Sequence, residues 1–159
     1  MEKVRKFTNP EFSDFLSDEL LKISDLELVI LKGHIFTEFA LNCYLESIST
    51  NNSSNFFKEN FSYNIKLKLL SHFGEFSGDR ELLISAFKIL NKLRNTIAHS
   101  LTINKQLLAE FIAKTKEIGI DNKLLEKVKT EPFYQFILCI SYLCGIIFGS
   151  YVKIRNENN

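Results

Sequence analysis

Residues that interrupt or cross-link a polypeptide are scarce in this chain of 159 residues. Two prolines and six glycines are too few for a fold built on many tight turns. The three cysteines, Cys43, Cys139 and Cys144, form no Cys-x-x-Cys pair and no zinc-ligand spacing. We therefore expect long uninterrupted helices and reduced thiols, in a protein that stays in the cytoplasm.

Tryptophan is absent, methionine occurs once, and neither sign of charge predominates. With 20 Lys and Arg against 19 Asp and Glu, the net charge of +1 does not by itself predict a nucleic-acid partner. The total does not exclude a local basic patch, however. The 15 phenylalanines and the many leucines should fill the core. No apolar run follows the charged residues 1–6, so we expect no secretory signal.

Apolar residues recur at spacings of three and four over most of the chain, which is the period of amphipathic helices. The Asn9-Pro10 pair is typical of a helix start with Asn9 as the N-cap, and Asp25 or Ser24 can cap the next helix. Helices are predicted over 10–23, 25–48, 63–73, 80–99, 104–118 and 132–153, with a polar loop over 49–55. Since no segment alternates as a strand does, the sequence predicts an all-α bundle of five or six helices. We expect a single domain over 1–159 with its core in about 10–153.

The last predicted helix has two interpretations. It is mostly apolar over about 20 residues, which is long enough to span a bilayer. Ser141, Gly145 and Gly149 continue a pattern of small residues found where helices meet in membranes. Against this, Gln135 and several tyrosines interrupt the run, and the central helix of a soluble bundle can be apolar all round. We expect a soluble bundle with no membrane partner, in which the glycines let another helix approach closely.

The most informative segment is Arg-Asn-Thr-Ile-Ala-His at 94–99, near the end of a predicted helix. Because helical residues turn by about 100° each, Arg94 and His99 should lie about 140° apart. Asn95 and His99, four residues apart, should share a face. Arg94 and His99 can therefore act on one phosphate only if the helix end bends or a second copy of the chain supplies one group.

These residue types suit RNA cleavage that needs neither a metal nor a cofactor. The 2′-hydroxyl of RNA attacks the adjacent phosphate. His99 can exchange protons near neutral pH, Arg94 can hold the phosphate and stabilise developing charge, and Asn95 can orient either group. Lys88 and Lys92 lie on the Asn95 face and are candidate RNA-binding residues. A second interpretation stays open, since a helix-end histidine can simply interact with the last carbonyl groups.

A polar pair, His34 and Glu38, interrupts the apolar face of the predicted helix 25–48. Burying such groups is costly unless they are hydrogen-bonded or ion-paired. The pair can be a satisfied core contact, which we favour. Alternatively, Glu38 can position Arg94 or His99 across a helix interface, which makes both residues supporting candidates for the site. A metal site would need more ligands than this pair supplies.

The predicted helix 63–73 carries Lys66 and Lys68 beside Tyr63 and close to Phe61. Basic and aromatic side chains together can contact the backbone and bases of RNA. The simpler interpretation is a solvated helix face, and this is what we expect for both lysines.

With these residues in view, the sequence resembles the HEPN superfamily of small helical domains. Arg94-Asn95-x3-His99 matches a motif in which an arginine, usually followed by a polar residue, precedes a histidine after a short spacer. Gly33-His34-x3-Glu38-x2-Leu41 resembles the mannitol-operon-repressor-like branch. The resemblance covers about 26–100, and the order of helices continues it to 151.

The resemblance implies a homodimer in which two motifs face each other across a cleft and cut RNA without metal. In this respect the chain is similar to ribonucleases of toxin and defence systems. The resemblance implies an antitoxin or regulatory protein as a further partner. The mannitol-repressor-like branch is associated with transcriptional regulation, although no helix-turn-helix reader is visible here. Two functions stay open: a ribonuclease of a toxin or defence system, and a non-catalytic transcriptional regulator or interaction module.

Overall fold

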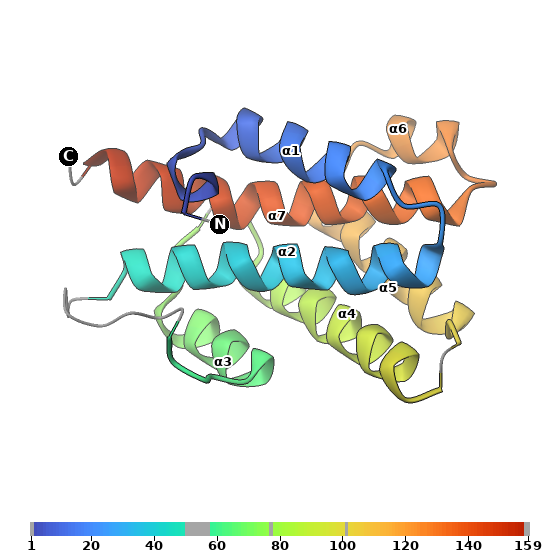
Figure 1. Cartoon of the computed structure of the whole chain (residues 1–159), viewed down its shortest axis with the longest axis horizontal. Coiled ribbons are helices and arrows are strands. Elements are labelled where there is room, and N and C mark those ends of the chain that lie inside the picture. Colours follow the sequence, from blue (N-terminus) through green and yellow to red (C-terminus); the bar gives the residue numbers. More distant parts are fainter. Residues whose placement is uncertain (1, 50–57, 77, 101, 158–159) are drawn as a thin grey trace.

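The structure, a computed structural model, describes residues 2–49, 58–76, 78–100 and 102–157 (Figure 1). Within these ranges the chain forms seven α-helices and one 3-10 helix, η1, and no strand, which confirms the all-α prediction. From residue 50 onward, the predicted loop lies outside the described residues. The elements are η1 (Val4–Lys6), α1 (Asn9–Leu21), α2 (Leu26–Ser47), α3 (Tyr63–Phe73), α4 (Arg80–Ser100), α5 (Lys105–Ile118), α6 (Asn122–Lys127) and α7 (Pro132–Glu157).

The helix α6 is one more than the five or six that the sequence predicts. Asp121 caps it, since its Oδ1 accepts a hydrogen bond of 2.8 Å from the backbone N–H of Lys123. Just before it, Gly119 ends α5 with a φ of 114°, a conformation that glycine adopts without steric penalty. Leu125 is the only residue of this short helix that is buried. A six-residue helix with one buried side chain leaves no periodic pattern in the sequence, which is why it was missed.

Side chains at the helix starts satisfy backbone N–H groups that would otherwise have no partner. Thr8 and Glu11 form a capping box at α1, so the predicted cap, Asn9, is instead the first helical residue. Asp25 caps α2 as predicted, by accepting a 2.8 Å hydrogen bond from the Leu28 N–H. Asp79 does the same for the start of α4 at 3.0 Å.

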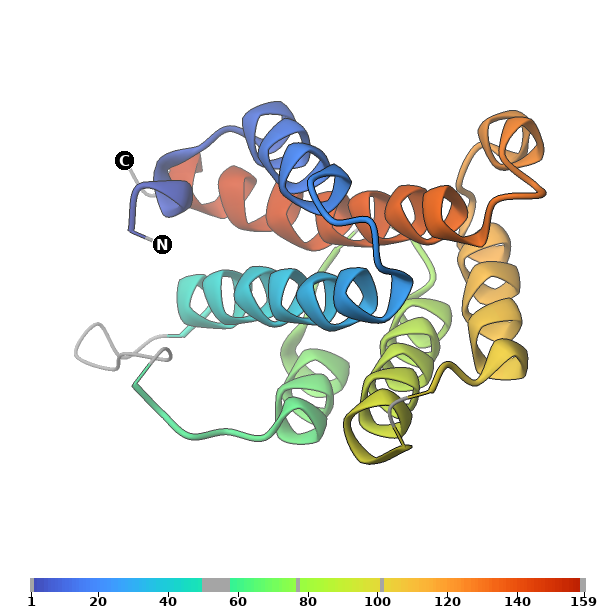
Figure 2. The same cartoon turned by 45° about the vertical axis from the view of Figure 1, so that its right-hand side comes forward.

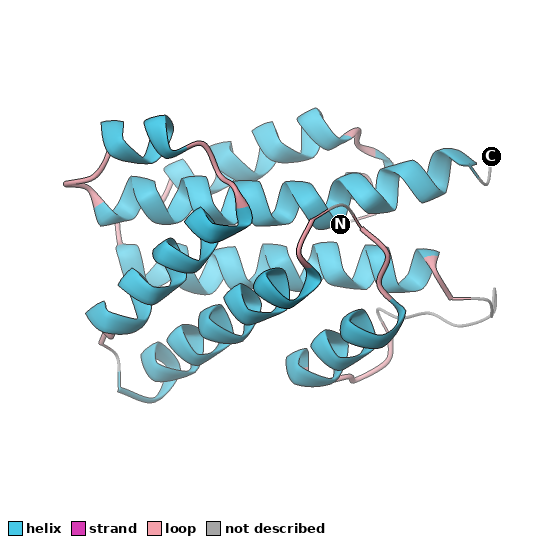
Figure 3. Ribbon diagram, turned by 180° about the vertical axis from the view of Figure 1, so that it is seen from behind, coloured by secondary structure: helices cyan, strands magenta, loops and turns pink. Residues whose placement is uncertain are grey.

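The central helix is α2, with α1 and α7 on one side and α3 and α4 on the other (Figures 1 and 2). Seen from behind, the described residues appear only as helices joined by loops (Figure 3). Both α2 and α7 are long and apolar enough to cross a membrane, a test that the core helices of soluble proteins also pass. The most apolar window is 72% buried in α2 but 44% buried in α7. The helix α7 therefore buries one face and is not enclosed on all sides, as the central helix of a bundle would be.

Close packing between α2 and α7 depends on Gly33. A Cβ atom at this position would lie 2.9 Å from Cε1 of Phe136, whose ring is fully buried. The glycines that the sequence singled out on α7 do other things: a Cβ on Gly149 would meet the Asn9 amide nitrogen at 2.9 Å, and Gly145 faces open space. The glycine that brings the two long helices together therefore belongs to α2.

One cluster of buried side chains forms the core, and each of the seven α-helices contributes to it. Phenylalanines join its elements; Phe12 of α1 stacks on Phe148 of α7 with ring centroids 3.9 Å apart. On α4 an apolar stripe with spacings of three and four is buried in full, and it comprises Leu83, Ala86, Leu90, Leu93 and Ile97. The remaining surface of α4 is left for polar side chains.

The connection between α3 and α4 is tied to α2 by Tyr44. The phenol donates a hydrogen bond of 2.9 Å to the carbonyl oxygen of Glu75 and accepts one of 2.6 Å from the N–H of the same residue. Burial raises the pKa of the Tyr44 hydroxyl, which therefore stays protonated as this double contact requires. The end of α3 is held against the C-terminal half of α2 in this way.

Candidate functional site

The candidate catalytic residues lie on the last two turns of α4. Arg94 is exposed, and its Nη1 donates a hydrogen bond of 3.0 Å to Oδ1 of the half-buried Asn95. His99 is exposed in the last turn, where basic side chains interact favourably with the helix dipole. The arginine and the histidine can therefore both be reached from solvent.

Arg94 and His99 leave α4 from different faces. The helix continues without interruption from Arg80 to Ser100. At about 100° per residue, the two side chains point in directions about 140° apart. The structure thus keeps the divergence that the sequence predicts, and one copy of the chain does not present both groups on a single face.

A basic stripe follows the same face of α4 as His99. Lys88 and Lys92 are exposed, and Asn95 lies between them and His99 in a half-buried position. These four residues are spaced by three or four positions, so they line one side of the helix. This side of α4 therefore presents exposed Lys88, Lys92 and His99 side chains to solvent.

Arg94 instead shares its face with Asn91 and Phe87, one and two turns earlier. This face points toward α2, since Phe87 is buried and Asn91 contacts His34. Burial lowers the pKa of His34 to about 4, and the positive charges of Arg94 and Lys66 act in the same direction. The positive charge of Arg94 therefore acts on the His34 ring of α2 and disfavours its protonated form.

His34, which is 5% exposed, begins a chain of hydrogen bonds across three helices. Its Nε2 lies 3.2 Å from Oδ1 of Asn91, and the Asn91 amide nitrogen donates to Oδ1 of Asn64 on α3, also at 3.2 Å. Because the Asn91 oxygen is an acceptor, His34 must be the donor, as in a neutral ring protonated on Nε2. The ring also lies against Tyr63, with centroids 4.2 Å apart.

Tyr63 extends this network into the core. Its hydroxyl lies 3.0 Å from Oγ1 of Thr37, which in turn donates a 2.7 Å hydrogen bond to the carbonyl oxygen of His34. Burial raises the pKa of Tyr63 well above its usual value. The network thus joins polar groups that are each satisfied, as buried polar groups must be for stability.

The partner of Glu38 is Lys66 of α3, with Nζ 2.5 Å from Oε1. The Lys66 side chain is only 5% exposed, so the expectation of a solvated face was wrong for this lysine, whereas Lys68 is exposed as expected. The Glu38 carboxylate is bonded to Lys66 and not to Arg94 or His99, so the hypothesis that it positions either of these residues gains no support from this contact. His34 and Glu38 each find a partner on a different neighbouring helix, as the core-contact interpretation expects.

The sequence reasoning missed several polar residues that surround His34. One of them, Asn91, did leave a signal in the sequence. It precedes Asn95 by one helical turn, and it is a polar residue on the side of α4 that faces the apolar stripe of α2. Asn64, Thr37 and Tyr63 gave no local signal, since their partners are distant in sequence.

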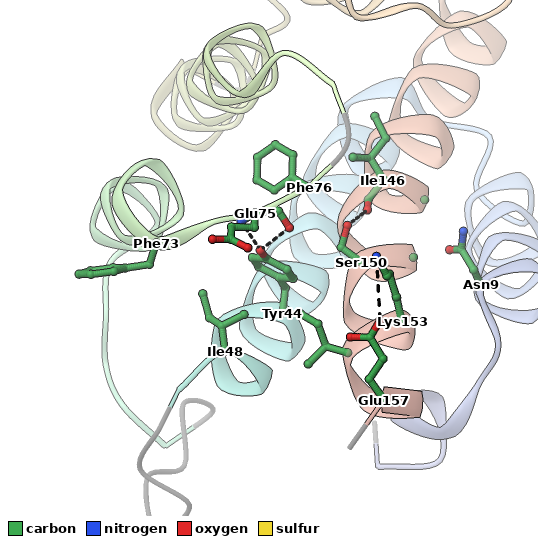
Figure 4. Close-up of a pocket in the computed structure, with 13 residues that line it drawn as sticks. Asn9, Tyr44, Ile48, Phe73, Glu75, Phe76, Ile146, Ser150, Lys153 and Glu157 are labelled. Atoms are coloured by element: carbon green, nitrogen blue, oxygen red, sulfur yellow. Dashed lines mark hydrogen bonds and ion pairs between the residues drawn. The ribbon is translucent and has the colours of Figure 1, made fainter. Parts of the chain in front are cut away.

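A second feature is a groove of about 760 Å³ between the C-terminal halves of α2 and α7 (Figure 4). Its walls carry Phe76, Ile146 and Gly145, and the Tyr44–Glu75 contact lies at one side. Neither Arg94 nor His99 lines this groove, so it is separate from the α4 motif.

The thiols are placed for packing. Within the described residues the three cysteines are free and buried. Burial raises the pKa of Cys43 and Cys139 to about 12 and also raises that of Cys144. Buried, protonated thiols are poor nucleophiles. In the same part of the chain, no three His, Cys, Asp or Glu side chains gather as a metal ion would need.

No protein-family model, no curated protein and no solved structure matches this chain. The resemblance to the HEPN superfamily therefore rests on the two residue motifs quoted above. The fold adds that these motifs lie on two long helices, α2 and α4, that pack against each other in an all-α protein.

Proposed function

We propose that this chain is a metal-independent endoribonuclease of the HEPN type that acts as a homodimer in a toxin or defence system. The observation that carries the proposal is the exposure of Arg94, His99 and the neighbouring lysines on the last turns of α4, beside a fully buried apolar stripe. Polar side chains that do not serve packing and point to solvent are available for a substrate.

In the proposed reaction His99 accepts the proton of the RNA 2′-hydroxyl or donates one to the leaving 5′-oxygen. The 2′-oxygen forms a bond to phosphorus as the bond to the 5′-oxygen breaks, which yields a 2′,3′-cyclic phosphate and a 5′-hydroxyl. Arg94 binds the non-bridging oxygens and stabilises the charge that builds on them. Its hydrogen bond to Asn95 limits the orientations of the guanidinium before substrate arrives.

A second copy would bring an arginine and a histidine together. Since Arg94 and His99 diverge on one helix, the proposed site takes one group from each protomer. A stripe of apolar residues on α2 supports such an assembly: Leu28 and Ile35 are 55% and 59% exposed, and Leu31 lies between them. The next residue of this stripe is Glu38, which is ion-paired with Lys66 of α3. Apolar surface of this kind is often covered by a partner.

The direct test is cleavage of a labelled single-stranded RNA by the purified protein in EDTA. We expect wild type to produce fragments ending in 2′,3′-cyclic phosphate, and His99→Ala to be slower by about 10²–10⁴. The exposed His72, which lies outside the motif, provides the matched control, and His72→Ala should retain activity. Equal inertness of wild type and His99→Ala on RNA would contradict the proposal.

The alternative function is a non-catalytic regulator or interaction module that retains the fold. The observation that favours it is the divergence of Arg94 and His99, which leaves a single protomer without an assembled site. A protein that stays monomeric at micromolar concentration and cleaves no RNA would fit this alternative.

A further inference from the structure

A groove of about 490 Å³ runs along α5 at the point where α2 and α7 begin. In Figure 2, α5 stands across the starting ends of these two helices. The α5 side of the groove extends over almost the whole helix and consists of Lys105, Leu108, Ala109, Ile112, Ala113 and Lys116. None of the α4 motif residues lines it, so it is a different surface from the proposed ribonuclease site.

The charges of this groove are arranged at its two ends. Lys105 and Lys116 are eleven residues apart, which is about three helical turns and about 16 Å along α5. They therefore lie on the same face, one near each end of the helix. The residues that line the groove include no Asp or Glu. Lys116 also approaches Glu126 of α6 at 3.9 Å, but water reaches both side chains, which are 36% and 59% exposed, so this ion pair is weak.

Between the two lysines the surface is apolar and shaped for a helix. Leu108 and Ile112 are 5% and 9% exposed and form the floor. Ala109 and Ala113, one turn apart, are exposed. Small residues at this spacing let a second helix approach to an axis separation of about 8 Å, the short end of the usual range.

We propose that this groove binds an amphipathic helix of a partner protein, with an apolar stripe flanked at each end by an acidic residue. The two lysines at opposite ends select this occupant over an acyl chain, because a fatty acid has a single carboxylate. They also disfavour a two-fold contact between copies of α5, which would set Lys105 of one copy against Lys116 of the other. An acidic helix satisfies both lysines and covers the apolar floor, a common mode of peptide recognition.

This inference goes beyond the proposed ribonuclease and does not depend on it, because its readout is binding. The probe is a fluorescent helical peptide of about 18 residues with Leu and Ile at i, i+3, i+4 and i+7 and Glu residues eleven positions apart. A matched peptide carries Lys in place of both Glu. We expect anisotropy titrations in low salt to show at least about tenfold tighter binding of the Glu peptide, with the difference shrinking in high salt.

The decisive comparison is a charge swap. The double variant Lys105→Glu, Lys116→Glu should lose affinity for the Glu peptide and gain affinity for the Lys peptide. Ala109→Trp, at an exposed position, should block both peptides and leave the circular dichroism spectrum unchanged. The control is Lys123→Glu, Lys127→Glu, which makes the same charge change at exposed positions of α6 outside the groove and should bind like wild type.

Three results would overturn the proposal. One is equal affinity for the Glu and Lys peptides, which would indicate apolar contact without charge selection. Another is binding of oleate, blocked by Ala109→Trp, with no binding of either peptide. The third is a dimer in light scattering that Ala109→Trp alone dissociates, since the occupant would then be a second copy.

Discussion

His34 on α2 donates a hydrogen bond from Nε2 to Oδ1 of Asn91 on α4, 3.2 Å away, and holds a neutral ring in the interior. Burial lowers the pKa of His34 to about 4, so the ring remains uncharged at neutral pH. The contact joins the helix that carries the Gly33-His34-x3-Glu38 motif to the helix that carries Arg94 and His99. Stability at this junction should therefore depend on pH.

The first prediction is a loss of folding stability in mild acid. In the unfolded chain a histidine titrates near pH 6.5, whereas in the folded protein His34 titrates near 4. Between these values the unfolded state binds more protons, so the free energy of unfolding falls as the pH falls, by up to about 3 kcal/mol from this residue. Above pH 6.5 the contribution is fully present. Urea unfolding of wild type at pH 7 and pH 4.5 measures it.

His34→Gln keeps a donor for Asn91 but does not titrate, so its unfolding free energy should change less between pH 7 and pH 4.5. The exposed His72 gives the matched control, and His72→Gln should follow wild type. Identical pH dependence of His34→Gln and wild type would show that the ring does not stay neutral in the folded state.

The second prediction concerns the ion pair between Lys66 and Glu38. The lysine is 5% exposed and the carboxylate 35% exposed. Removing the carboxylate should therefore lower the free energy of unfolding more than removing the lysine does. Glu38→Gln leaves a buried ammonium group without a counter-charge and should destabilise the protein by about 3 kcal/mol. Lys66→Met leaves a carboxylate that water can reach and should cost clearly less. Lys68→Met, on the exposed face of the same helix, is the control in urea unfolding. The reverse order of the two effects would contradict this account.

The third prediction concerns the α2–α7 contact at Gly33. Alanine is the better helix former by about 1 kcal/mol, yet its Cβ would lie 2.9 Å from the buried ring of Phe136. Because that ring is fully buried and any shift of it disturbs the core, Gly33→Ala should be a net destabilisation of about 1–2 kcal/mol. Gly145→Ala, on α7 with open space around its Cβ, should be neutral or stabilising. The midpoints of thermal unfolding of both variants, compared with wild type, test this prediction. A Gly33→Ala variant more stable than wild type would show that α2 and α7 can separate at little cost.

The fourth prediction tests whether the proposed site is shared between two copies. Arg94→Ala and His99→Ala should each be inactive on RNA. When equal amounts are mixed, half of the dimers are mixed, and each of these contains one site with both groups. Activity should then recover to about one quarter of the wild-type rate. Recovery requires exchange of protomers, which light scattering and a mixed-tag pull-down verify. If mixing restores nothing while exchange is complete, each site draws both groups from one chain or from neither.

Most of the fold could be read from the sequence because its signals are local. Asp25 caps the helix that it was expected to cap, and the apolar residues of α4 at spacings of three and four are buried as that period predicts. The polar contacts around the site were harder to predict from the sequence. Lys66 looks like any surface lysine on its own helix, and it is buried because Glu38, 28 positions earlier in the chain, meets it across the helix interface. Asn91 likewise gains its role only when α4 packs on α2.

The two hydrogen bonds between Tyr44 and Glu75 involve only the main chain of position 75. As far as this contact is concerned, the identity of residue 75 is free, with one restriction: proline has no N–H to donate to the phenol. Position 44 is the constrained partner, since phenylalanine would have the same ring but leave two backbone groups without a partner. Variation during evolution should therefore be tolerated at 75 and resisted at 44, and at 44 the requirement is for the hydroxyl group as well as for a ring that fills the core.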